Sequence, residues 1–130
     1  MDMFKRLRKL VLFASGACAL MCLVACERTT IETNLLGRWE KVSGQSRPNS
    51  RMRTYNPGEI TLDYQNGGRL IAVWDEEPHY YEWRVEKDGA VLKVDEEGDT
   101  RRFKYTFNED GTILIVEIKT GIRQIYRRIQ

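Results

Sequence analysis

Few side chains in this sequence could carry out covalent or proton-transfer chemistry. The 130 residues include a single histidine, His79, and three cysteines, all of them within the first 26 positions. A Ser-His-Asp or Cys-His site would therefore have to use His79, which stands between Pro78 and Tyr80 at the expected start of a strand. Because no nucleophile with a matched base is apparent, we expect the protein not to be an enzyme.

The acidic residues and glycines show no metal or phosphate pattern. The densest acidic run, Asp95-Glu96-Glu97-Gly98-Asp99, lacks the ligand spacing of a calcium-binding hand. Paired carboxylates that hydrolyse glycosides need a cleft, whereas these lie on turns. No helix is expected after Gly67-Gly68, so this pair is a turn and not a phosphate cradle. We expect no metal and no cofactor.

The charge distribution argues against nucleic acid as a partner, although the formal net charge is +2. Four of the basic residues, Lys5, Arg6, Arg8 and Lys9, lie in a segment that we expect to be removed. The remainder is close to neutral, whereas phosphate binding needs net or clustered positive charge.

The N-terminus carries the clearest functional signal. Basic residues up to Lys9 precede an uncharged apolar run, Leu10 to Ala25, which is shorter than the ~20 residues that a membrane span needs. The run ends in Leu23-Val24-Ala25-Cys26, which resembles the lipobox of bacterial lipoproteins. The resemblance implies cleavage before Cys26 and acylation of its thiol and new amino group. The alternatives are an ordinary secreted protein or an uncleaved anchor.

The rival cysteines fit this pattern less well. Cys22 follows the bulky Met21, and the apolar run before Cys18 is too short. We therefore expect a signal peptide over 1–25, a lipidated cysteine and tether over 26–34, and a folded domain over 35–130. Two or three acyl chains would hold the protein firmly on a bacterial membrane, in the periplasm or facing the surface. No cysteine follows Cys26, so no disulfide stabilises the domain.

Strand patterns fill the folded part of the chain. Apolar residues alternate with polar ones, and turn residues recur about every ten positions, which favours a sandwich or barrel. Short turns favour an antiparallel up-and-down meander, and closure removes its exposed edges. The fold class predicted is all-β, with eight strands closed into a small barrel after a signal-peptide helix. The expected strands are 35–43, 59–64, 69–74, 79–85, 91–94, 101–107, 112–119 and 122–129.

Gly37 and Trp39 lie two residues apart in the first strand, and so on one face of it. Glycine allows a close approach, and the indole ring can plug one end of a closed sheet. Together with the strand count, this Gly-x-Trp resembles the lipocalin-like families, which are eight-stranded barrels with a late basic residue packed on that tryptophan. The resemblance implies that Arg127 or Arg128 supplies the cation, at about 0.5–2 kcal/mol.

Aromatic residues dominate the side chains expected inside the barrel, so we expect a mostly filled interior and not a deep pocket. The inward residues expected are Trp39, Leu62, Tyr64, Tyr81, Trp83, Leu92, Val94, Phe103, Tyr105, Phe107, Leu114 and Val116.

Counting along a meander assigns its two ends. The end away from the tether carries a long loop over 44–58 and the turns at 75–78, 95–99 and 120–121. Tyr55, Trp74, His79 and Tyr80 lie at that end, where they form a candidate shallow ligand site. The loop also carries Arg47, Arg51 and Arg53, which we expect to fold over the acidic turns as a lid.

We therefore expect a lipocalin-like binding module for a small hydrophobic or aromatic ligand. The alternative is a protein-interaction or inhibitor module that presents the same loops to an envelope partner. A cavity of a few hundred Å³ opening beneath the 44–58 loop favours the first function, and a dry interior favours the second.

Overall fold

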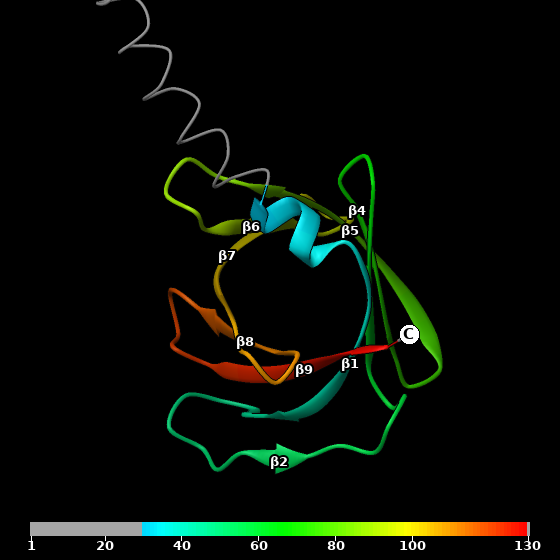
Figure 1. Cartoon of the computed structure of the whole chain (residues 1–130), viewed down its shortest axis with the longest axis vertical. Helices are drawn as coiled ribbons and strands as arrows, with labels where there is room; N and C mark the ends of the chain where they lie inside the picture. The colour runs from blue at the N-terminus through cyan, green and yellow to red at the C-terminus, as the bar shows by residue number, and fades with distance from the viewer. Residues whose placement is uncertain (1–29, 130) are drawn as a thin grey trace, which may run out of the picture.

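The structure is a computed structural model that describes residues 30–129. The predicted signal peptide and Cys26 lie outside these residues. The strands of the described part form one antiparallel sheet (Figure 1). They are β1 (Gly37–Gly44), β2 (Arg53–Thr54), β3 (Thr61–Gln65), β4 (Arg69–Trp74), β5 (Glu77–Val85), β6 (Val91–Val94), β7 (Thr100–Phe107), β8 (Thr112–Glu117) and β9 (Arg123–Ile129).

The sheet closes on itself because β1 pairs with β9 as well as with β3. Strand β1 and strands β3 to β9 therefore form a ring of eight in chain order, which confirms the predicted eight-stranded antiparallel barrel. The hairpin turns use glycine where the backbone needs positive φ, as between β3 and β4, where Gly67 and Gly68 have φ of 86° and 79°. We call the end of the barrel that holds this turn the near end and the opposite end the far end.

A short helix over residues 30–35 closes the near end, where a polar tether had been predicted (Figure 1). Leu35 is fully buried, and Ile31 packs against the core and lies beside Gly89 in the β5–β6 turn. The prediction was wrong here. Ile31 and Leu35 are four positions apart, so a helix places both on one face, toward the core. The folded domain therefore includes residues 30–34, and β1 begins at Gly37.

The long loop adds a strand to the barrel wall and does not form the predicted lid. Strand β2 pairs with the far end of β1, at Ser43 and Gly44. The buried Gln45 ties the loop to β9, because its backbone N–H donates to the Arg123 carbonyl and its side-chain oxygen accepts from the Arg123 N–H, both at 2.9 Å. Within residues 30–129, no ion pair links the loop arginines to the acidic turns, and Arg53 pairs with Glu59 at 3.8 Å.

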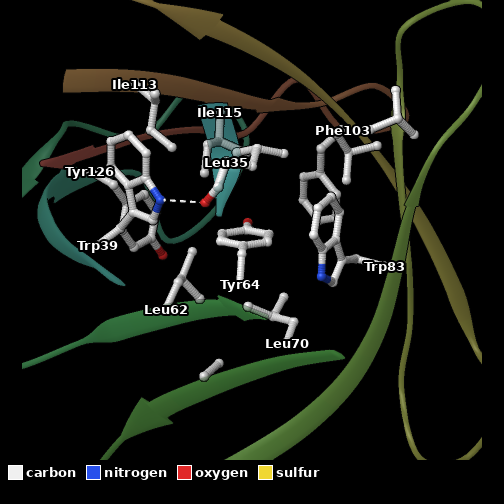
Figure 2. Packing of buried hydrophobic residues seen from close by; sticks show 13 residues of the cluster. Leu35, Trp39, Leu62, Tyr64, Leu70, Trp83, Phe103, Ile113, Ile115 and Tyr126 are labelled. Atoms are coloured by element: carbon white, nitrogen blue, oxygen red, sulfur yellow. Dashed lines mark hydrogen bonds between the residues drawn. The ribbon is translucent and has the colours of Figure 1, made fainter. Parts of the chain in front are cut away.

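The apolar core fills the near half of the barrel (Figure 2). The Tyr64 ring meets Trp83 edge to face, with centroids 5.3 Å apart, and its hydroxyl hydrogen-bonds to that of Tyr105. Other buried members include Leu35, Trp39, Leu70, Phe103, Ile113, Ile115 and Tyr126.

Two strands face the opposite way from the prediction. In β8, Ile113 and Ile115 are buried inside, whereas Leu114 and Val116 were expected there. In β6, Val91 and Lys93 face inward in place of Leu92 and Val94, because they lie opposite Val85 and Trp83 of β5. Apolar residues on both faces leave the alternation ambiguous, so the register of the neighbouring strand decides which face is inside.

Candidate ligand-binding site

The Gly-x-Trp residues form the plug at the near end. The Trp39 indole N–H donates to the Leu35 carbonyl at 2.9 Å, the bond drawn in Figure 2. The Arg128 guanidinium carbon lies 4.2 Å from the centre of the Trp39 ring, and its nitrogens donate to the carbonyls of Leu36 and Asn34. Arg128 therefore links the plugging helix to the barrel wall.

Gly37 leaves space for the Arg128 side chain. The Gly37 backbone has φ of 113°, and a Cβ atom there would come within 3.0 Å of the Arg128 side chain. Arg127, the other predicted candidate, points to the outer face and binds Glu40 at 3.1 Å. Of the two arginines, Arg128 is the one that packs on the indole ring.

The far half of the barrel is hollow, which corrects the prediction of a mostly filled interior. A cavity of about 300 Å³ opens at the far end. Small Ala72 and the polar residues Lys41, Lys93 and Gln124 stand where larger apolar side chains would fill the space. Its lining also includes Ile60, Leu62, Leu70, Trp74, Tyr81, Asp95, Asp99, Arg101, Phe103 and Tyr126.

Lys93 is the most unusual residue of this lining. Its ammonium group lies 4.6 Å from the centre of the Phe103 ring and 5.5 and 5.6 Å from those of Tyr64 and Tyr105. Burial, together with the nearby Arg101 charge, lowers the pKa of the Lys93 amine to about 7. Its charge therefore depends on what else occupies the cavity.

Lys41 is a second inward-facing lysine of the cavity. It is buried, and its ammonium lies 4.5 Å from the centre of the Tyr55 ring. Burial first, and the Arg53 charge second, lower the pKa of the Lys41 amine. A Cβ at Gly44 would come within 2.6 Å of the Lys41 side chain. The absence of a side chain at Gly44 therefore leaves space for the Lys41 side chain.

Two of the remaining charged groups of the lining, Arg101 and Asp95, have partners of their own. Arg101 forms an ion pair with the buried Glu117. The Asp95 carboxylate accepts the backbone N–H groups of Glu97 and Asp99, at 3.0 and 2.9 Å, within its own turn. In the part of the chain that the structure describes, no carboxylate forms an ion pair with Lys41 or Lys93. The cavity therefore has an apolar wall with positive charge that no carboxylate pairs.

The four residues predicted to bind a ligand do not all come together. Trp74 lines the cavity, and the His79 ring stacks on it, with centroids 3.5 Å apart and planes within 7°. His79 is itself outside the lining, and its buried Nε2 has no hydrogen-bond partner among residues 30–129. Tyr55 is also outside the lining, and its ring contacts the lining residue Lys41.

Tyr80 lies on the outer face, 52% exposed, and Tyr81 takes the inward position instead. Successive residues of a strand point to opposite sides, so His79 and Tyr80 cannot share one site.

Sequence reasoning missed both lysines. A lysine in a strand is by default assigned to the solvent face. A register count across the β5–β6 hairpin would have found Lys93, because it pairs with Trp83, which was predicted to face inward.

No family model matches this chain, and no curated protein matches it. Among residues 30–129, no helix has the length and apolar character required to cross a membrane. The same residues contain no group of three or more His, Cys, Asp or Glu side chains placed to hold a metal ion. The fold and cavity thus define a closed eight-stranded β-barrel that is plugged at one end and open at the other.

Proposed function

We propose that the protein is a lipid-anchored lipoprotein of the bacterial cell envelope. Its lipocalin-like barrel binds a small hydrophobic or aromatic ligand at the far end without catalysing a reaction. The observation that carries this proposal is the far-end cavity. Its volume is about 300 Å³, and Trp74, Tyr81, Phe103 and Tyr126 supply aromatic wall. Ligand sites are typically concave and mostly apolar, of ~300–1,000 Å³, with a few polar groups.

The position of the chain entry supports an anchor at Cys26. Residues 30–35 lie at the near end, and the cavity opens at the far end. A lipid attached four residues before this helix would hold the near end toward the bilayer, so the open mouth would face away from it.

A neutral fluorescent probe, N-phenyl-1-naphthylamine, tests the binding function. We expect micromolar binding to the full chain and at least a roughly tenfold loss in Ala72→Leu, because the larger side chain fills the cavity. Ile71→Leu on the outer face of the same strand is the matched control and should bind as before. Absence of probe binding, or equal binding by Ala72→Leu, would contradict the proposal.

The anchor is tested separately by mass spectrometry of protein purified from bacterial membranes. The mature chain should begin at an acylated Cys26, and Cys26→Ser should release it from the membrane fraction. Cys18→Ser should change neither result. A mature protein that begins elsewhere, or that carries no acyl chain, would overturn the lipoprotein assignment.

One observation supports the alternative function of protein interaction. Strand β6 pairs only with Glu82–Val85 of β5, so within the described part of the chain residues 77–81 have no strand partner on that edge. Exposed Tyr80 lines a hollow of about 480 Å³ on this outer surface. A photo-crosslinking residue at position 80 would capture an envelope partner in cells, whereas the same residue at Lys104, on the outer face of β7, would not.

A further inference from the structure

We propose that the ligand of the far-end cavity is an amphiphilic anion, and that its oxyanion pairs with Lys93. Its apolar or aromatic body lies against the cavity wall, and Lys41 is the second cation of the same cavity. This inference rests on the proposed binding function and names the chemical class of the ligand.

The first argument is that, among the described residues, no carboxylate forms an ion pair with Lys93. Burying an ammonium is costly unless it is paired. Its neighbours within reach are the faces of Phe103, Tyr64 and Tyr105, which recover only part of that cost. An anion that enters the cavity would supply the missing partner.

The second argument is that the protein's own carboxylates are committed elsewhere or lie at the rim. Glu117 is bound to Arg101, and Asp95 is bound to the amides of its turn. Glu40, on the same strand as Lys41, binds Arg127 outside the barrel. Asp99, the other acidic residue of the lining, forms no ion pair with Lys41 or Lys93. Among residues 30–129, the cavity thus has two lysines that no carboxylate pairs.

The third argument is the position of Lys93 along the depth of the cavity. Lys93 lies opposite Trp83 in the sheet, and Trp83 belongs to the buried core below the cavity. An anionic group that reached Lys93 would therefore be deep in the cavity, with its body beside Trp74 and Tyr81 nearer the mouth. This arrangement suits a ligand with charge at one end only.

Anion binding should depend on pH. A paired anion favours the protonated amine, so affinity should be highest at pH 6 and fall by pH 9 as Lys93 loses its proton. Other groups can also titrate around the site, so the dependence must be assigned with a Lys93 variant. These charged and titratable groups are Lys41, Tyr64, His79, Tyr81, Asp95, Asp99, Arg101, Tyr105, Glu117 and Tyr126.

Two probes with the same ring system isolate the charge. N-Phenyl-1-naphthylamine is neutral, and 8-anilinonaphthalene-1-sulfonate adds one sulfonate. At pH 6 we expect the full chain to bind the sulfonate probe at least roughly tenfold more tightly than the neutral one. In Lys93→Met this preference should disappear while neutral-probe binding remains.

Two further variants serve as controls. Lys93→Arg should keep the sulfonate preference up to pH 9, because a guanidinium stays protonated. Lys104→Met, an exposed lysine on β7, should behave like the unchanged protein. Near-ultraviolet circular dichroism must show native tertiary structure in each variant, since the sulfonate probe also binds partly unfolded chains.

The outcomes separate this inference from the function on which it rests. If the neutral probe binds as tightly as the sulfonate and Lys93→Met changes neither, the anion inference fails while the binding function stands. If neither probe binds the full chain, the binding function itself fails. A sulfonate preference that persists in Lys93→Met would likewise overturn the role of Lys93.

Discussion

At the scale of single residues, Lys93 is an energetically unfavourable residue for the interior of a barrel. The inward positions around it are aromatic, and it contributes a charge that no carboxylate among residues 30–129 pairs. Residues that destabilise a fold often serve function, because selection retains them despite their cost. The cost itself can be measured without knowing the ligand.

We predict that Lys93→Met changes how stability depends on pH. The Lys93 pKa is about 7 in the folded protein and ~10.4 when unfolded, so between these values the unfolded chain binds more protons. The stability of the ligand-free protein should therefore rise from pH 7 toward pH 10, with the full cost present below pH 7. Urea unfolding at pH 6, 8 and 9.5 should show this rise, and Lys93→Met should flatten it. Parallel curves for the two proteins would contradict the prediction.

Arg128 and Arg127 are adjacent in β9 but make different contacts. A substitution of Arg127 can therefore serve as the control for the same substitution of Arg128. Arg128 stacks on Trp39 and donates to two carbonyls near the end of the short helix. Arg127 makes an exposed ion pair with Glu40, a kind of contact that contributes ~0–1 kcal/mol. We predict that Arg128→Met lowers the free energy of unfolding by about 1–3 kcal/mol and Arg127→Met by less than about 1. Equal losses in denaturant melts would argue against a role for Arg128 in closing the barrel.

At the scale of elements, the helix over 30–35 completes the core. Its contribution depends on Leu35, which is fully buried in contact with the core cluster. We predict that Leu35→Ala costs about 2–5 kcal/mol of stability, as other buried leucines do. Thr33→Ala, on the exposed side of the same helix, should cost less than about 1 kcal/mol. Similar melting temperatures for the two variants would show that the helix does not plug the barrel.

The loop between β1 and β3 shows how one buried polar residue can decide the path of a segment. Gln45 bonds to the backbone of Arg123 twice, and its amide donates to the Ser50 carbonyl at 2.9 Å. These bonds hold the loop against β9 and the end of β1, so the mouth beside it stays open. Among the loop arginines, Arg53 pairs with Glu59 at 3.8 Å, an exposed ion pair of the kind that contributes only ~0–1 kcal/mol.

At the scale of the whole molecule, the barrel is divided into a filled half and a hollow half. The near half has the helix, the Trp39 plug and the aromatic cluster, which give the domain its stability without a disulfide. The far half has Lys41, Lys93 and the small Ala72 around open space, with an aromatic wall. The residues that stabilise the fold thus lie at the near end of the barrel, and the residues of the candidate binding site lie at the far end.

The filled half predicts an alkaline limit to stability. Burial raises the pKa of Tyr64, Tyr105 and Tyr126, in each case as the largest effect. Above pH ~10 the unfolded chain releases tyrosine protons that the folded chain retains, so stability is present below that pH and is lost as pH rises further. Absorbance at 295 nm should show at least three of the six tyrosines ionising only when circular dichroism reports unfolding. Ionisation of all six in the native fold would contradict this.

The sequence by itself determined the fold class, the antiparallel order of the strands and the near-end residues Gly37 and Trp39. These follow from local signals, which are period-two alternation, turn residues and a glycine before an aromatic ring. Only the tertiary structure decided which face of β6 and β8 turns inward, that residues 30–35 plug the barrel, and that Lys93 and Lys41 lie in a cavity. Those features depend on which neighbour each strand pairs with, and a side chain's burial is set across the sheet and not along the chain.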